Sequence, residues 1–326
     1  MRRLWKPLSA AFFGAALVVA TLGQAAAFPT RPITLIVPWA AGGGTDAIAR
    51  QIAAQMEREL GQAVSVVNRT GGSGVVGHSA IATAEPDGYT IGLITLEINM
   101  MHWVGLTEMT HADFTPLALM NEDPSAIHVQ ADSPYETLGD LLDAIRANPG
   151  GLAASGTGQG GSWHLALAGM LREQGIDPTA VQWVPSTGAA TALTELAAGG
   201  VDFVSCSLPE ARALIEAGRL RSLGIMAAER ADILPDVPTI EEAVGSTWTG
   251  GVWRGMAGPA GMPEDIVARY EEVLKGVYDS AEFQDFMEAR GFDVLWGTAA
   301  EFGDFMAENN DDIGAILREL GLAQAG

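Results

Sequence analysis

The stretch "VPWAAGGGTDAIARQ", residues 37–51, decides the fold. An apolar run ends in three glycines, Gly42 to Gly44, and a helical pattern begins directly after them. Apolar residues then recur every four positions, at Ile48, Ile52, Met56 and Leu60. This spacing places them on one face of a helix. The stretch therefore predicts a buried strand, a glycine turn and a helix, with Thr45 as the N-cap and Gly61 as the C-terminal stop.

A strand, a glycine turn and a helix together make an anion site. Free backbone N–H groups and the positive end of the helix dipole point at the same place, and no lysine or arginine is needed. A second such unit, "SGTGQGGSWHLA", occupies residues 155–166. Each half of the chain thus offers one neutral anion site. The alternative, that the glycines only make tight turns, stays open here and for a third glycine-rich stretch at residues 71–77.

The same glycines also fit the dinucleotide-binding fingerprint, as Gly42-x-Gly44-x-x-Ala47 and Gly156-x-Gly158-x-x-Gly161. No charged catalytic residue stands beside either loop, and no catalytic constellation is visible. We therefore expect no cofactor and no enzyme activity. The five histidines are scattered and Cys206 is the one cysteine. A metal site is not expected, and an intramolecular disulfide is excluded.

The N-terminal residues 1–27 have the pattern of a secretory signal peptide. "MRRLWK" is basic, an apolar run follows, and "AAA" at 25–27 offers small residues for a cut before Phe28. We predict an exported, periplasmic protein. The formal net charge of −22 repels nucleic acid and anionic lipid surfaces, so neither is an expected partner.

The rest of the chain alternates apolar runs with amphipathic helices, which favours α/β lobes with parallel sheets. Residues 114–135 contain two short apolar segments and prolines, and they predict two short strands and a loop that cross between lobes. Residues 250–261 predict the return crossing. We expect lobe 1 to comprise 28–123 and 251–326, and lobe 2 to comprise 124–250. Two crossings make a hinge, with the cleft at the carboxyl ends of the strands.

Several stretches together resemble one family, the solute receptors of tripartite tricarboxylate transporters (Bug/TctC type). They are "FPTRPITLIVPWAAGGGTDAIAR" (28–50), "GQAVSVVNRTGGSGVVG" (61–77), "PDGYTIGL" (86–93), "SGTGQGGSWHLA" (155–166), "VPSTGAATALTELAAGGVD" (184–202), "EAGRLRSLGI" (216–225), "LPDVPTIEEA" (234–243) and "PAGMPEDIV" (259–267). The resemblance implies a type II periplasmic-binding-protein fold and capture of a small carboxylate between the lobes. It also implies a monomer that delivers the ligand to a permease of one large and one small membrane subunit.

The resemblance also implies which residues hold the ligand. Trp39 should form an aromatic wall, and other first-loop residues should contact the ligand or order the loop. Two further edges come from lobe 2. The implied residues are Ala41, Gly43, Thr45 and Asp46 in the first loop, Ser155, Gly156, Thr157, Gly158, Ser162 and His164 in the facing turn, and Ser186, Thr187 and Gly188 in the third edge. For His164, packing on its own helical turn is an equal alternative.

Three positions depart from the family pattern or have two interpretations. After the strand "VDFV", where many members carry Phe-Asp, this chain has Ser205, Cys206 and Ser207, which puts an acidic contact at this spot in doubt. Glu97 replaces a small or polar residue; it could bind an amine or hydroxyl of the ligand, or lie outside the cleft. Arg254 could pair with a ligand acid or form a salt bridge at the hinge. A sensory role, in which the closed lobes signal to another protein, remains the alternative to transport.

Overall fold

Residues 28–324 of a computed structural model are described here; the predicted signal peptide lies outside them. Their strands form one nine-stranded sheet in the order β2-β1-β3-β9-β4-β7-β5-β6, with β8 also paired to β4. Lobe 1 contains β1 (Ile33–Val37), α1 (Gly44–Leu60), β2 (Val64–Asn68), α2 (Val75–Ala82), β3 (Thr90–Thr95), β9 (Gly251–Pro259), α8 (Glu264–Asp279), α9 (Ala281–Arg290) and α10 (Ala299–Glu319).

Lobe 2 has the same construction of strands alternating with helices. It contains α3 (Leu138–Ala147), β5 (Leu152–Ser155), α4 (Ser162–Glu173), β6 (Val181–Trp183), α5 (Ala189–Ala197), β7 (Phe203–Ser207), α6 (Leu208–Glu216), β8 (Leu220–Ile225) and α7 (Ile240–Val244). In each lobe the first strands pair in parallel, β1 with β2 and β3, and β5 with β6 and β7. Each series therefore has the predicted parallel topology.

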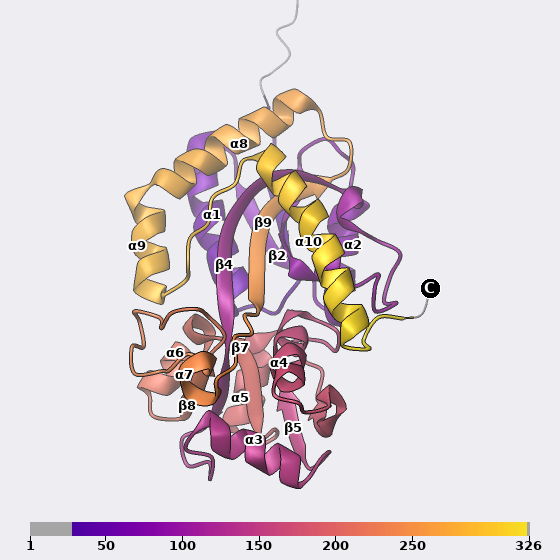
Figure 1. The fold of residues 1–326 in the computed structure, drawn as a ribbon. Helices are drawn as coiled ribbons and strands as arrows, with labels where there is room; N and C mark the ends of the chain where they lie inside the picture. The colour runs from indigo at the N-terminus through magenta and orange to yellow at the C-terminus, as the bar shows by residue number, and fades with distance from the viewer. Residues whose placement is uncertain (1–27, 325–326) are drawn as a thin grey trace, which may run out of the picture.

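The two lobes share one long strand, β4 (Phe114–Gln130), which runs through both halves of the molecule (Figure 1). The prediction of two short strands and a loop over 114–135 was wrong. Pro116 sits beside an irregularity in the pairing with β9, where a missing N–H is tolerated. Pro124 is the last residue paired with β9, and Ser125 begins the pairing with β7. This change of partner fits the predicted boundaries at 123/124 and 250/251, which stay a prediction.

Helix α1 packs as its sequence pattern predicts. Ile48, Ile52 and Met56 are fully buried, and each buried side chain of this size contributes roughly 1.5–3 kcal/mol. Gly61 ends the helix in the left-handed conformation, with φ of 64°. The predicted N-cap was wrong: the cap is Gly43, and it makes no side-chain hydrogen bond. Thr45 is the second residue of the helix, two positions after the cap, and its hydroxyl accepts a hydrogen bond from Arg254.

The core of lobe 1 is completed by C-terminal helices that cover its sheet (Figure 1). On α8, Tyr270, Val273 and Val277 recur at helical spacing and are buried in the core of lobe 1. Within residues 28–324, no helix combines the length and apolar character that a membrane crossing requires.

Candidate ligand-binding site

A cavity of about 20 Å³ lies between the lobes. This is room for about one water molecule. It is lined by both lobes and by the crossing strand β9, through Trp39, Ala40, Gly43, Gly44, Thr45, Glu97, Thr157, Ser162, Trp163, Gly188, Ala189, Glu210, Val252 and Arg254. Eight of the predicted site residues therefore meet here: Trp39, Gly43, Thr45, Glu97, Thr157, Ser162, Gly188 and Arg254.

The first loop is held rigid by Asp46, which does not line the cavity. Its carboxylate accepts hydrogen bonds from the Gly42 amide at 3.0 Å and from Asn68 at 2.9 Å, and it pairs with Arg50 at 2.8 Å. Although burial raises the pKa of Asp46, these hydrogen bonds outweigh it and hold the pKa below its usual value. Of the two predicted roles, Asp46 orders the loop.

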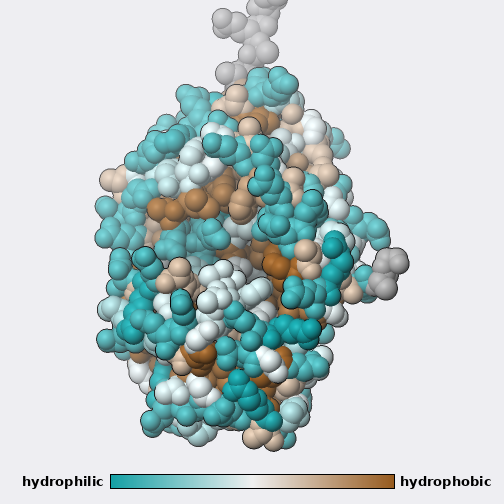
Figure 2. All heavy atoms as spheres, in the orientation of Figure 1, coloured by the Kyte–Doolittle hydropathy of each residue, from teal (hydrophilic) through white to brown (hydrophobic). Residues whose placement is uncertain are grey.

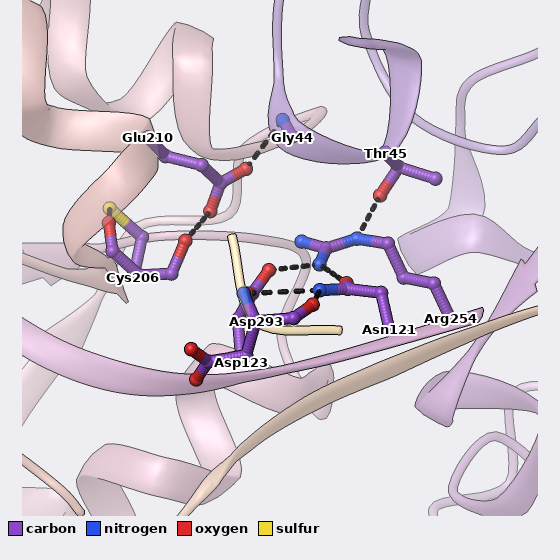
Figure 3. Close-up of polar contacts among 9 residues, drawn as sticks. Gly44, Thr45, Asn121, Asp123, Cys206, Glu210, Arg254 and Asp293 are labelled. Carbon is purple, nitrogen blue, oxygen red and sulfur yellow. Dashed lines mark hydrogen bonds and ion pairs between the residues drawn. The ribbon is translucent and has the colours of Figure 1, made fainter. Parts of the chain in front are cut away.

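Glu210 is the main residue that the sequence interpretation missed. It lies in the first turn of α6 in lobe 2, and its Oε1 accepts a hydrogen bond from the Gly44 amide of lobe 1 at 2.9 Å (Figure 3). Its Oε2 accepts from Ser207 Oγ at 3.1 Å. Burial raises the pKa of Glu210, against the opposing effect of Arg254. A carboxylate of the protein thus occupies the N-terminus of α1.

Glu97 makes the reciprocal contact from lobe 1. Its Oε1 accepts hydrogen bonds from the amide and the hydroxyl of Ser162 at 2.9 and 2.7 Å, at the N-terminus of α4. Its Oε2 accepts from Thr95 Oγ1 at 2.5 Å, and Trp39 donates to the same hydroxyl at 3.1 Å. Glu97 is 1% exposed and lines the cavity. Each helix N-terminus predicted as an anion site therefore holds a carboxylate from the opposite lobe.

Arg254 lies on β9 with its side chain between the lobe 1 loop and the crossing strands (Figure 3). Nε donates to Thr45 Oγ1 at 3.0 Å. Nη1 donates to Asn121 and forms an ion pair with Asp123. The predicted hinge salt bridge is thus present. Among the described residues, Nη2 has no hydrogen-bond partner, so it remains available at the cavity.

Lobe 2 contributes an unpaired hydroxyl. Thr157 is 3% exposed, and its Oγ1 has no hydrogen-bond partner within residues 28–324. Burying a hydroxyl without a partner is costly, so the Thr157 hydroxyl is a candidate hydrogen-bonding group for a ligand in the cavity. Gly188 and Trp163 complete this wall.

Nine predicted site residues lie outside the cavity lining. They are Ala41, Asp46, Ser155, Gly156, Gly158, His164, Ser186, Thr187 and Ser205. Most have structural contacts instead: Ser155 donates to Val184 O at 2.7 Å, and Ser205 exchanges a hydrogen bond with Ser125 at 2.9 Å. The ring of His164 packs beside Trp183 at 4.8 Å, and its Nδ1 accepts from the Gly160 amide of its own turn. Burial lowers the pKa of His164 to about 4.

Two of these outer residues help hold the lobes together. The Ala40 amide of lobe 1 donates to Thr187 O of lobe 2 at 3.1 Å. Gly158 lies against Ser73, whose hydroxyl donates to Gln159 O at 3.2 Å. A Cβ on Gly158 would come within 2.1 Å of Ser73 Oγ, so this position needs glycine. The lobes are therefore in contact at two further places.

A larger cavity of about 450 Å³ lies beside the crossing strands and α10. Figure 2 shows apolar surface in a hollow between the lobes. Its lining includes Trp253 and Phe305 but also Glu122, Asp123 and Asp293. Burial, together with Asp123 and Glu122, raises the pKa of Asp293 to about 6. Neither glycine-rich anion loop reaches this cavity, and its charged groups would repel a carboxylate.

Comparisons with known proteins identify the family of this chain. A sequence profile described as "Tripartite tricarboxylate transporter family receptor" matches residues 48–322. The "UPF0065 protein in tcbD-tcbE intergenic region" of Pseudomonas sp. (strain P51) is 33% identical over 288 residues, 87% of this chain and 85% of that protein. Among solved structures, periplasmic binding protein BugD has a TM-score of 0.85 at 25% identity, covering 91% of this chain and 100% of that chain.

A third similar protein was solved with a ligand. MatC from Rhodopseudomonas palustris with bound malate has a TM-score of 0.83 at 28% identity, covering 89% of this chain and 100% of that chain. These neighbours confirm the predicted α/β fold with the two lobes of a periplasmic binding protein.

Proposed function

Because the chain belongs to the receptor family of tripartite tricarboxylate transporters, we propose that it binds one small organic carboxylate between its lobes. The bound form is then delivered to a permease of one large and one small membrane subunit. The chain acts as a periplasmic monomer after removal of residues 1–27, and it catalyses no reaction.

One observation carries the proposal: the Gly44 amide at the cavity already holds a carboxylate, that of Glu210, at 2.9 Å. A backbone amide at a helix N-terminus binds any carboxylate by the same contact. The unpaired hydroxyl of Thr157 and the guanidinium of Arg254 line the same cavity and offer further hydrogen bonds. A ligand carboxylate that displaces Glu210 would thus find donors from both lobes. The malate bound to MatC is likewise a small organic carboxylate.

Binding is tested by thermal shift and calorimetry on the mature chain, residues 28–326. The panel contains mono-, di- and aromatic carboxylates, each beside its uncharged amide. We expect at least one carboxylate to raise the melting temperature while its fully amidated form does not. If no carboxylate binds at millimolar concentration, the proposed function is wrong.

Delivery is tested in cells that lack this chain. We expect uptake of the bound carboxylate to fall and to recover when the chain is restored. Unchanged uptake together with tight binding would instead favour the sensory role, because sensing and transport use the same cleft.

A further inference from the structure

We propose that Glu97 and Glu210 restrict the ligand to a molecule with a single carboxylate and a hydrogen-bond-donating group, such as an ammonium, amide or hydroxyl. This inference rests on the proposed function and names its substrate class. Glu210 marks the place of the ligand carboxylate, and Glu97 remains in position and accepts from the donor group.

The two carboxylates are not held equally. Glu97 accepts three hydrogen bonds, two from Ser162 across the cavity and one from Thr95 in its own lobe. Glu210 accepts two, and only that from Gly44 crosses the cavity. Glu210 is also partly exposed, whereas Glu97 is 1% exposed. An incoming carboxylate therefore replaces Glu210 at α1 more readily than it replaces Glu97 at α4.

The charges around the cavity disfavour a second carboxylate. Two acids, Glu97 and Glu210, line it, against the single guanidinium of Arg254. That guanidinium is already paired with Asp123, and both partners are 1% exposed. A dicarboxylate whose first carboxylate sits at Gly44 would bring its other end toward Glu97. Like charges placed together in a water-poor site reject a ligand strongly.

A hydrogen-bond-donating group of the ligand is attracted to Glu97, whereas a second carboxylate is repelled. An ionised carboxylate has about four acceptor sites, and Glu97 uses three of them. The remaining site belongs to a residue that lines the cavity, where the Thr157 hydroxyl is also unpaired. Only about 20 Å³ is free while Glu210 is in place, so the ligand has to occupy the space that Glu210 vacates. In a small monocarboxylate with one donor group, the carboxylate can accept from the Gly44 amide and the donor group can donate to Glu97.

The inference is tested with ligand pairs that share one carbon skeleton: succinate with succinamate, and adipate with its monoamide. Calorimetry on the mature chain should show the monoamide binding at least about tenfold tighter than the dicarboxylate, a difference of about 1.4 kcal/mol. Glu97→Gln, whose amide can donate to a carboxylate, should remove or reverse this preference. Glu308→Gln is the control, because it makes the same charge change on the exposed surface of α10.

The outcomes separate the two proposals. If the dicarboxylate binds wild-type protein as tightly as its monoamide, the specificity inference is wrong but carboxylate binding stands. If neither binds and no other carboxylate does, the proposed function itself fails. If Glu97→Gln does not fold, shown by circular dichroism, the wild-type comparison still decides. A preference in Glu97→Gln equal to that of Glu308→Gln would exclude Glu97 as its source.

Discussion

Glu210 at the start of α6 and Gly44 at the start of α1 meet across the cavity at 2.9 Å, although they are far apart in sequence. The contact joins lobe 2 to lobe 1 at the point where a ligand carboxylate is expected. Glu97 and Ser162 make the mirror contact from lobe 1 to α4. The ligand-free protein therefore has two internal carboxylates that hold its lobes together.

Removal of both contacts should open the ligand-free protein. We expect Glu97→Ala combined with Glu210→Ala to increase the radius of gyration measured by small-angle scattering, because two charge-assisted hydrogen-bond sets across the cavity are lost. Glu308→Ala should leave the radius unchanged. The same radius for the double variant and the wild type would mean that other contacts, such as Ala40 with Thr187, keep the lobes closed.

The buried pair of Arg254 and Asp123 should stabilise the fold at the hinge. Both side chains are 1% exposed, so a single substitution leaves an unpaired buried charge. We expect Arg254→Met to lower the free energy of unfolding by about 3–5 kcal/mol in urea denaturation. The double variant Arg254→Met with Asp123→Asn should recover part of this loss. A double variant less stable than Arg254→Met would contradict the charge explanation.

The sequence was informative about local structure. The spacing of Ile48, Ile52 and Met56 predicted α1, and Gly61 its end, because burial and backbone freedom act within a few residues. The length of β4 was not predictable in this way. Its sequence contains Pro116 and Pro124. Both are tolerated because the pairing with β9 is irregular beside Pro116 and ends at Pro124. That pairing joins segments more than a hundred residues apart.

The candidate site was predicted only in part, because some of its residues lie in local turns and others meet only when the two lobes come together. The family resemblance implied Gly43 and Thr157, which lie in local glycine turns and line the cavity. Glu210 was missed because an acid in the first turn of a helix is common, and nothing in its neighbours shows that the opposite lobe approaches it. The one sequence signal of contact between the lobes was Glu97, an acid at a position where the family usually has a small or polar residue. A buried acid needs hydrogen-bond donors, and those of Glu97 come in part from the opposite lobe. His164 hydrogen-bonds to the Gly160 amide of its own turn and does not line the cavity, so the alternative given for it in the sequence analysis holds.

Acid should destabilise the protein through His128 in lobe 2. This ring is fully buried between Ser222 and the Cys206 carbonyl, and burial lowers its pKa to about 4. The unfolded chain takes up the proton near pH 6.5, so stability falls as the pH drops from 6.5 to 4. We expect a loss of up to about 3 kcal/mol from this group.

The measurement is urea denaturation of the wild type and of His128→Gln across this pH range. Gln keeps hydrogen-bonding capacity but does not titrate, so the variant should show a shallower loss of stability in acid. His111→Gln is the matched control, because His111 lies in lobe 1 and is partly exposed. Parallel pH profiles for wild type and His128→Gln would refute the assignment.

A carboxylate fixed beside the Gly44 amide should exclude the ligand. Gly43 has φ of −80°, which any residue adopts, and a Cβ there would lie 3.6 Å from its nearest neighbours, an ordinary contact. Gly43→Asp should therefore leave the backbone unstrained while placing a second carboxylate beside Glu210 at the N-terminus of α1. We expect carboxylate affinity to fall at least about 100-fold, or about 2.8 kcal/mol. Gly43→Asn has nearly the same shape without the charge and should lose much less. Equal losses in the two variants, measured by calorimetry, would point to blocked space rather than charge, and unchanged affinity in Gly43→Asp would remove the first loop from the binding site.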